Sequence, residues 1–447
     1  MSGTGGPRDR ESIDPDAPET APVPGEEPTS GVGSVSAAES TEPAAPELVY
    51  TLGSSRRIKL REAESELRAL WEEASREAAQ VGQEGVLRLR EINLVAYAAG
   101  EAVAERVSQV IARLAQRHPA RAIILLDVGL DAPGVGATDA WVSAACYLTP
   151  QGERHVCWEQ VTIPAWGRAA DLLHTTALPV LVPHLPTVLW WPGQPDLRGE
   201  VFRRLGDVTD LLVVDSAGFT NPLKGLGDLA ALVRVPSRNY HINDLNWGRL
   251  TLWREMVAEI FDDPARLDGL RRVRRLRVAY GAEERSGDST RTAGPAAARA
   301  LLVAGWLATR LGWRADIAGW ETEGSTFKTL LSGPDPTTGS VELLLEPRVL
   351  SAGATGGLVS VEMQFGDPVD PVSLFVGRLG ESCMCEARVE GGGEEVTRTL
   401  DASPVPEDRL LAEELDYLGA DRVYEESLVF AAALAALPGG GGLAGPS

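Results

Sequence analysis

The residues best suited to recognising another molecule are concentrated in one stretch, Asp244 to Arg254, which reads Asp-Leu-Asn-Trp-Gly-Arg-Leu-Thr-Leu-Trp-Arg. Tryptophan and arginine are enriched at the energetic centres of protein interfaces, and here they stand beside an acid and an amide. We therefore interpret this stretch as a partner-binding surface. The side chains assigned to it are Asp244, Asn246, Trp247, Arg249 and Arg254.

The second half of the same stretch has the spacing of an amphipathic helix. Apolar residues recur at three- and four-residue intervals at Leu250, Trp253, Val257 and Ile260. This periodicity places Trp253 in the core. The helix is expected to end before Pro264, because proline has no backbone N–H to donate. For Trp247 and Arg249 the pattern leaves both a surface role and a core role open.

Two predicted strands end in residues that suit a binding site. Thr187–Trp191 is followed by Pro192-Gly193, and a second strand ends at Asp215-Ser216. Ligands of open α/β sheets bind beyond the carboxyl ends of the strands, so we add Trp190 and Trp191 to the partner-binding residues. Adjacent strand residues point to opposite faces, and the alternative is that both indoles belong to the sheet core.

Several motifs that would indicate catalysis are incomplete. Gly134-Val-Gly136 leads into another strand-like run instead of a helix, and Lys224-Gly-Leu-Gly227 lacks the Gly-Lys-Ser/Thr ending of a phosphate loop. No serine stands in a Gly-x-Ser-x-Gly elbow. Five scattered histidines and the Cys383-Met-Cys385 pair do not form a zinc pattern. We predict no catalytic residue, no metal and no cofactor.

The chain has four cysteines, too few for a disulfide scaffold of this length. Cys146 and Cys157 lie on the two arms of a predicted hairpin. A three-residue loop at 150–152 places them on opposite faces, whereas a four-residue loop places them opposite one another. Whether these two, or Cys383 and Cys385, respond to redox conditions is not decided by the sequence.

The charge balance limits the classes of partner. A net charge of -22 repels phosphate backbones, which argues against a nucleic-acid partner. The one basic run, Arg271–Arg277, is interpreted as the solvated side of a strand, with a patch for phosphate or an acidic partner as the alternative. No apolar run approaches the roughly 18 to 20 residues of a membrane span, and no signal core follows Met1. We expect a cytoplasmic protein without a membrane partner.

Composition and periodicity divide the chain into four parts. Residues 1–46 are acidic and rich in Pro, Gly and Ser, as in a disordered tail. Residues 47–270 alternate predicted strands and amphipathic helices, which predicts an α/β domain with a mixed, mostly parallel sheet and flanking helices. Residues 271–437 carry short strands in quick succession, which predicts a smaller α+β domain with an antiparallel sheet. Residues 438–447 form a Gly-rich tail.

Seven segments together resemble the glucose-6-phosphate dehydrogenase assembly protein family, OpcA. They are Glu91–Tyr97, His118–Ile124, Cys157–Thr162, Leu178–Pro183, Leu189–Pro195, Leu212–Ser216 and Asp244–Arg254. The segments run in the order of the family across about residues 48 to 263. The Asp-Leu-Asn-Trp-x-Arg-Leu-Thr-x-Trp-Arg core is their most specific part.

The resemblance implies a non-catalytic allosteric activator that binds the glucose-6-phosphate dehydrogenase oligomer and favours its active form. Such a protein supports the oxidative pentose phosphate pathway and its supply of NADPH. The alternative is a sugar-phosphate- or nucleotide-binding enzyme with a pocket at the carboxyl ends of the α/β strands. In that enzyme Arg254, Arg271 or Lys224 would hold the phosphate.

Overall fold

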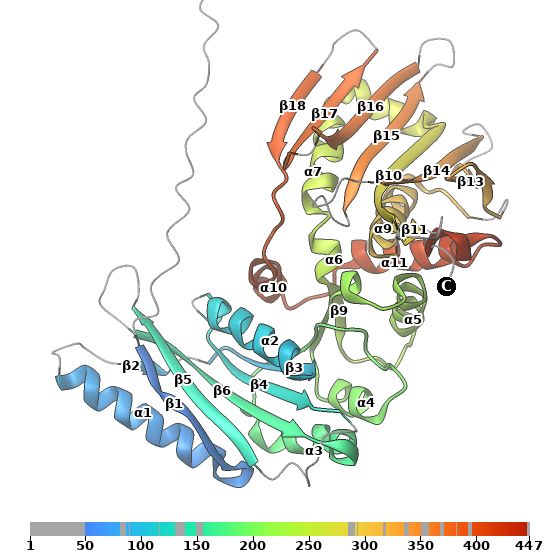
Figure 1. Cartoon of the computed structure of the whole chain (residues 1–447). Helices are drawn as coiled ribbons and strands as arrows, with labels where there is room; N and C mark the ends of the chain where they lie inside the picture. Colours follow the sequence, from blue (N-terminus) through green and yellow to red (C-terminus); the bar gives the residue numbers. More distant parts are fainter. Residues whose placement is uncertain are drawn as a thin grey trace, which may run out of the picture. The chain divides into compact units, whose positions relative to one another are not determined.

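Two nine-stranded sheets and their flanking helices form the part of the chain that a computed structural model describes (Figure 1). The described residues are 50–80, 86–88, 90–115, 117–129, 139–148, 155–284, 291–292, 294–315, 319–334, 339–349, 357–366, 371–380, 382–391 and 396–444. The predicted tail of residues 1–46 and the Gly134–Gly136 segment lie outside these ranges.

The first sheet is mostly parallel, as the alternation of strands and helices predicted. Its order is β1 (Tyr50–Lys59), β5 (Asp139–Leu148), β6 (His155–Ala165), β4 (Ala120–Asp127), β3 (Ile92–Ala99), β7 (Thr187–Trp191), β8 (Leu211–Val214) and β9 (His241–Asp244), with β2 (Val86–Arg88) beside β6. In the order of the sheet, each pair of neighbours from β6 through β4, β3, β7 and β8 to β9 runs parallel. The pairs β1–β5 and β5–β6 are antiparallel. β7 and β8 are buried along their whole length, as expected for strands covered on both faces.

Helices cover this sheet and connect its strands. They are η1 (Leu60–Glu62), α1 (Ala63–Gln80), α2 (Glu101–Leu114), η2 (Gly167–Leu172), α3 (Leu173–Ala177), η3 (Leu178–Val180), α4 (Glu200–Gly206), η4 (Ser216–Gly218), α5 (Pro222–Val233), α6 (Leu245–Gly248), α7 (Thr251–Ile260), α8 (Pro264–Leu267) and η5 (Asp268–Arg272). In α2 the residues Val107, Ile111 and Leu114 fall on one buried stripe, because three- and four-residue steps bring side chains to the same face of a helix.

A buried ion pair fixes α1 to the sheet. Arg121 on β4 and Glu159 on β6 are paired in register, and their side chains are 1% and 0% exposed. Trp71 of α1 donates its indole N–H to Glu159 at 2.9 Å, and Glu64 accepts from Arg121 at 2.9 Å. A buried charge without a partner costs several kcal/mol, so this network strongly favours one position of α1.

The register of the β5–β6 hairpin corresponds to the four-residue loop of the two alternatives considered. Its Cα pairing sets Cys146 against Cys157 and Leu148 against His155. The loop between the strands and the two cysteine side chains lie outside the described residues. Cys383 is exposed, Cys385 is buried, and both are free thiols. Burial raises the pKa of the Cys385 thiol.

The second sheet is antiparallel apart from one parallel pair. Its order is β12 (Glu321–Glu323), β13 (Thr326–Ser332), β14 (Ser340–Val349), β10 (Arg275–Glu284), β15 (Leu358–Gly366), β16 (Pro371–Arg378), β17 (Met384–Glu390) and β18 (Val396–Asp401), with β11 (Arg291–Thr292) beside β10. β10 and β14 run parallel, with α9 (Gly294–Leu311) between them in the chain. Helices α7 and α9 lie behind the sheet (Figure 1), where α9 contacts β10, β14 and β15.

The C-terminal helices return to the first sheet. α10 (Glu407–Asp416) packs on α2, and α11 (Arg422–Ala435) packs on α5 and α9. In the segment expected to be a Gly-rich tail, residues Gly440–Ala444 form the short helix η6 with Leu443 buried. One hydrophobic cluster includes residues of both sheets, and residues 46–447 form one compact unit. The division into two domains at residue 270 therefore stays a prediction.

Candidate partner-binding site

The predicted binding stretch begins where the last parallel strand turns into a helix. Asp244 ends β9 and caps α6, because its carboxylate accepts the backbone N–H of Asn246 at 2.9 Å. The same oxygen accepts the backbone N–H of Ser216 at 2.9 Å, which ties the ends of β8 and β9 together. Tyr424 of α11 donates its hydroxyl to the other oxygen at 3.4 Å.

Asp244 and Asn246 are completely buried, with 0% of each residue exposed. Burial, followed by the nearby charge of Asp215, raises the pKa of Asp244 to about 6. Asn246 donates to the Ser216 hydroxyl at 2.9 Å and accepts from Arg299 of α9 at 2.6 Å. Asp244 and Asn246 thus connect the end of the first sheet to α11 and α9, and α9 in turn packs on the second sheet.

Arg249 forms a two-pronged ion pair with Asp215. Its two terminal nitrogens lie 2.7 and 2.8 Å from the carboxylate oxygens, the geometry in which guanidinium and carboxylate bind most strongly. The Arg249 side chain keeps 23% of its surface exposed, against 8% for Asp215. Burial, followed by repulsion from Arg249, lowers the pKa of the neighbouring Arg299 to about 10.

Trp247 is held between two other parts of the chain. Only 3% of it is exposed, and its indole N–H donates to Asp421 at 2.8 Å. The guanidinium of Arg254 stacks on the indole ring at 3.6 Å, close enough for a cation–π interaction. Burial lowers the pKa of Arg254 to about 10. Arg254 remains partly exposed, so Arg249 and Arg254 are the members of the predicted set that reach the surface.

Trp190 and Trp191 belong to the core. They are 0% and 5% exposed and, as strand geometry predicted, they lie in different hydrophobic clusters. Trp191 stacks on Tyr97 with the ring centres 4.0 Å apart and meets Phe202 edge-on at 5.5 Å. Neither indole offers a partner more than a few per cent of its surface in this conformation.

The structure therefore joins five of the seven predicted residues, Asp244 to Arg254, in one network and places the two strand tryptophans apart from it. Sequence reasoning missed three of their partners: Arg299, Asp421 and Tyr424 lie far along the chain and carry no local motif. A polar cap on α11 was the one available signal, since Asp421 also accepts the backbone N–H of Tyr424 at 2.8 Å.

α10 closes the same end of the first sheet. Asn243 of β9 donates to Glu414 at 2.6 Å, and burial raises the pKa of Glu414 to about 7. Arg113 of α2 pairs with Asp408 at 2.8 Å. The side chains of Asp215, Asp244 and Asn246 and the amide N–H of Asn243 are thus engaged by each other and by groups from α6, α9, α10 and α11.

The groups considered for phosphate binding lie on separate elements. Lys224 is within α5 and pairs with Asp228, and Arg271 lies in η5. Arg275 and Arg277 point from β10 toward Glu342 and Glu346, as expected for the solvated side of a strand. Among the described residues, no group of three His, Cys, Asp or Glu side chains could hold a metal ion. Nor does any helix in the described ranges have the length and apolarity needed to cross a membrane.

Comparison with known proteins relates this arrangement to one family. Residues 111–231 match the model of the glucose-6-phosphate dehydrogenase subunit N-terminal domain, and residues 240–428 match that of the C-terminal domain. The chain is 27% identical over 330 residues to a candidate OxPP cycle protein, OpcA, of Synechocystis sp., a match that covers 72% of this chain and 64% of that protein. An OpcA protein of Synechococcus elongatus is 29% identical, with 72% and 69% covered.

Solved structures show only a distant likeness. A candidate oxidoreductase from Erwinia carotovora atroseptica has a TM-score of 0.43 and 11% identity, with 77% of this chain and 97% of that chain covered. A dehydrogenase (MviM) from Clostridium difficile has a TM-score of 0.39 and 10% identity, with 77% and 97% covered. A similarity at this level does not define a function.

The fold and the site define an α/β protein whose polar strand ends are closed by its own C-terminal helices. The two matched models together span more than half of the chain. The chain belongs to the OpcA family of glucose-6-phosphate dehydrogenase subunit proteins.

Proposed function

We propose that this chain is a non-catalytic protein that binds glucose-6-phosphate dehydrogenase in the cytoplasm and favours its active oligomer. It would thereby support the oxidative pentose phosphate pathway and the supply of NADPH. The observation that carries the proposal is the match of residues 111–231 and 240–428 to models named for a glucose-6-phosphate dehydrogenase subunit. The match spans 64% of the Synechocystis OpcA protein, so the partners of this chain are part of the proposal.

The geometry at the ends of β8 and β9 supports the absence of catalysis. A small-molecule site needs polar groups that converge on a cavity, whereas Asp215, Asp244 and Asn246 are engaged by internal partners. Two hollows in the described part of the chain lie elsewhere, on the second sheet and between α7 and β18. Arg254, Arg271 and Lys224, the phosphate-binding residues of the enzyme alternative, line neither.

Arg249 and Arg254 would contact the dehydrogenase directly, because they are the partly exposed members of the network. Asp215 would hold the guanidinium of Arg249, and Trp247 that of Arg254. Asp244 and Asn246 would fix the turn from β9 into α6 that carries them, and Trp190 and Trp191 would support the end of the sheet. Activation requires tighter binding to the active oligomer than to the inactive one, since equal affinity shifts no equilibrium.

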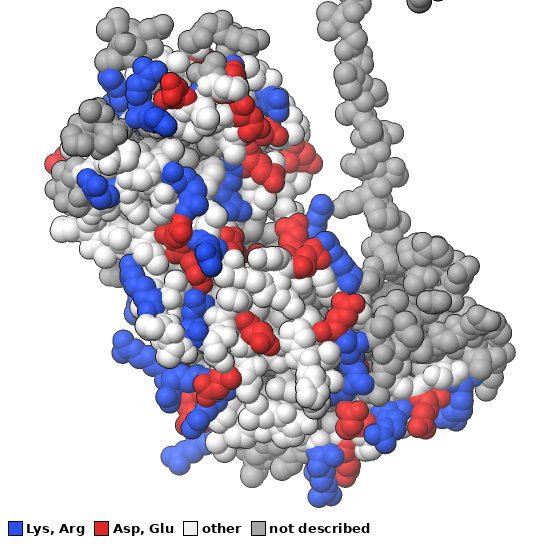
Figure 2. Space-filling model, turned by 180° about the vertical axis from the view of Figure 1, so that it is seen from behind, with Lys and Arg blue, Asp and Glu red and all other residues white. Residues whose placement is uncertain are grey.

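A protein partner also fits the distribution of charge. In Figure 2, basic and acidic side chains lie side by side over much of the visible face instead of gathering by sign. Nucleic-acid binding favours one continuous basic surface, which this face does not present. We propose neither nucleic acid nor membrane as a partner.

The test is a titration of the purified protein into the glucose-6-phosphate dehydrogenase of the same organism, with the initial rate as readout. Saturable activation together with co-elution in size-exclusion chromatography is the expected result. The titration is run under oxidising and under reducing conditions, because four cysteines are present. No complex and no change in rate under either condition would overturn the proposal. Turnover by the isolated chain would instead favour the enzyme alternative.

A further inference from the structure

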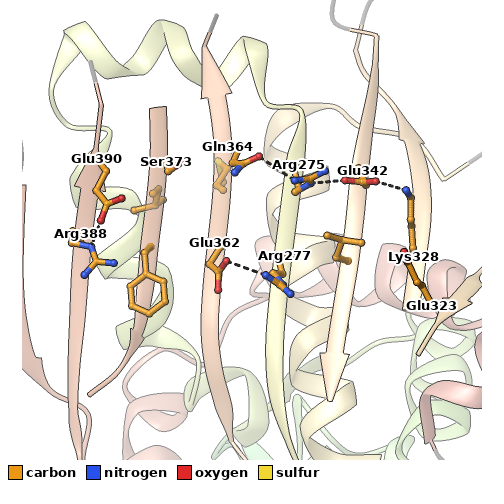
Figure 3. A pocket seen from close by; sticks show the side chains of 14 residues that line it. Arg275, Arg277, Glu323, Lys328, Glu342, Glu362, Gln364, Ser373, Arg388 and Glu390 are labelled. Atoms are coloured by element: carbon orange, nitrogen blue, oxygen red, sulfur yellow. Dashed lines mark hydrogen bonds and ion pairs between the residues drawn. The ribbon is translucent and has the colours of Figure 1, made fainter. Parts of the chain in front are cut away.

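The second sheet covers its core with one face and presents the other to solvent. Along β14 the residues Val341, Leu343 and Leu345 are buried toward the helices, while Glu342 and Glu346 point the other way and stay partly exposed. The exposed side holds a hollow of about 470 Å³ (Figure 3). We name this side, across β13, β14, β10, β15, β16 and β17, the ion-ladder face.

Strand register arranges the ion-ladder face in rows that run across the strands. In the order β13 to β17, the first row is Leu330, Glu342, Arg275, Gln364, Ser373 and Glu390. The second row is Lys328, Leu344, Arg277, Glu362, Phe375 and Arg388. From β13 to β15 the strands alternate in charge, whereas β16 contributes no charge and β17 contributes both Arg388 and Glu390. Figure 3 shows the contacts from Lys328 through Glu342 to Arg275 and from Arg277 to Glu362.

The hollow on this face is lined by equal numbers of cations and anions, although the chain is strongly acidic. The cations lining the hollow are Arg275, Arg277, Lys328 and Arg388, and the anions are Glu323, Glu342, Glu362 and Glu390. Lys328 lies 2.5 Å from Glu342, and Arg388 stacks on Phe375 at 5.3 Å. Two chains that each carry a net charge of -22 repel one another in general, but they do not repel through this face.

We propose that the ion-ladder face is an interface between two copies of this chain, related by a twofold axis that runs parallel to the strands between β14 and β10. Such an axis places each row of one copy opposite the same row of the other copy. β14 then faces β10 of the second copy, and β13 faces its β15. Glu342 then meets Arg275 of the second copy, and Lys328 meets its Glu362. Opposite charges face each other at both positions, and each contact occurs twice.

The remaining positions near the axis are compatible with this packing. Leu344 faces Arg277 of the second copy, whose stem can cover an apolar side chain, and Glu346 faces Ala279. Like charges do not meet at any of these positions. The rotation between packed sheets, about 30°, displaces contacts least near the centre of the interface.

The face is large enough for such an interface. With this axis the overlapping strands run from β12 to β16, because β17 lies opposite the space beyond the edge strand β12. These six strands span about 24 Å at about 4.8 Å per strand, and all but the three-residue β12 have 7 to 10 residues, or about 24 to 34 Å. The resulting area of about 500 to 700 Å² per chain approaches the roughly 800 Å² that each partner buries in a stable complex.

The test uses sedimentation of the full-length protein and two charge reversals that should each abolish self-association. In a Lys328→Glu homodimer, residue 328 faces Glu362 twice. In a Glu362→Lys homodimer, residue 362 faces Lys328 twice. We expect each variant to weaken the dimer by at least about tenfold, because like charges that face each other across an interface repel. A 1:1 mixture of the two variants restores opposite charges at both contacts and should restore the dimer.

Controls separate this result from damage to the fold and from the proposed function. Arg198→Glu makes the same charge change as Lys328→Glu at an exposed site in the first half of the chain and should leave the dimer intact. Circular dichroism confirms that each variant is folded.

A wild-type protein that stays monomeric at all concentrations, or a mixture that stays monomeric, overturns the proposal. A monomeric protein whose binding to the dehydrogenase is lost in both reversal variants assigns the face to that enzyme instead. Self-association without dehydrogenase binding refutes only the proposed function.

Discussion

Asp244 should make the stability of the protein depend on pH. Its pKa in the folded chain is raised to about 6, above its ordinary value of 3.8, because burial disfavours the carboxylate. The folded state then binds the proton more tightly than the unfolded state. This contribution to stability is fully present below about pH 4 and is lost as the pH rises through about 6. A shift of this size corresponds to about 3 kcal/mol as an order of magnitude.

The measurement is the free energy of unfolding from urea titrations between pH 4 and 7. The difference between wild type and Asp244→Asn isolates the contribution of this carboxyl group, because other acids titrate in both proteins. In wild type this carboxyl group makes the free energy of unfolding fall between about pH 4 and 6, and we expect the fall to be smaller in Asp244→Asn. Asp207 is an exposed acid at the end of α4, and Asp207→Asn serves as the control. This variant should show the same dependence of the free energy of unfolding on pH as wild type. A slope unchanged in Asp244→Asn would mean that this group titrates normally.

Substitution of Trp247 should lower the stability of the fold, whatever its effect on partner binding. Replacing a buried Trp by Ala costs about 3–5 kcal/mol, and Trp247 also loses its hydrogen bond to Asp421. We expect Trp247→Ala to lower the free energy of unfolding by about this amount, measured by chemical denaturation. A change below about 1 kcal/mol would show that the indole is not held as described. Arg254→Gln tests the binding role separately, because it removes a partly exposed guanidinium and keeps the Trp247 indole itself.

Residue-level sequence reasoning succeeded where a pattern was local. The spacing of Leu250, Trp253, Val257 and Ile260 correctly predicted the buried face of α7. The polar half of the same stretch was interpreted as a surface, yet Asp244 and Asn246 are buried. Their partners come from α9 and α11, and a single sequence does not reveal pairing between residues so far apart. An unexplained charge inside an apolar strand, such as Arg121, is the signal that could have revealed a buried ion pair.

At the scale of elements, α9 and α11 pack so closely that a glycine is required. A Cβ added at Gly305 would lie 2.4 Å from the carbonyl oxygen of Ser427 and 3.2 Å from the backbone nitrogen of Ala431. We expect Gly305→Ala to destabilise the protein by about 1–3 kcal/mol through overpacking, despite the better helix propensity of alanine.

Gly227 provides the matched control, because it lies in helix α5 and a Cβ there meets nothing within 4 Å. Gly227→Ala should therefore stabilise the protein by about 0.5–1 kcal/mol. Thermal unfolding of both variants against wild type measures the two effects. Equal shifts of the same sign would mean that α9 and α11 can separate enough to accommodate a methyl group.

Element prediction was most accurate where amphipathic helices alternate with apolar strands. It predicted strands for β3 to β8 and the closing helices α10 and α11, but no strand for β1 or β9 at the two edges of the first sheet. It missed β13 and β18, because neither is a continuous apolar run: β13 buries only alternate residues of its second half, and β18 is mostly exposed at the sheet edge. The packing of α10 on α2 was also not predicted, since helix periodicity identifies a buried face but not its partner.

At the scale of the whole molecule, the two halves should unfold together. The sequence predicted a boundary at residue 270, but α11 packs on α5 of the first half and on α9 of the second. Residues of both sheets share one hydrophobic cluster, so neither half can separate without exposing apolar surface. We expect a single urea transition in which tryptophan fluorescence and far-ultraviolet circular dichroism coincide.

The same argument predicts that residues 47–270 do not fold stably alone. Separated from the rest, this part would expose the side of α5 that contacts α11, the side of α2 that contacts α10, and the buried face of α7. We expect the isolated segment to lack the near-ultraviolet circular dichroism of packed tryptophans and to aggregate, because exposed apolar patches of this kind drive association. A monomeric segment with a cooperative transition of its own would instead establish the boundary at residue 270 as a true domain limit.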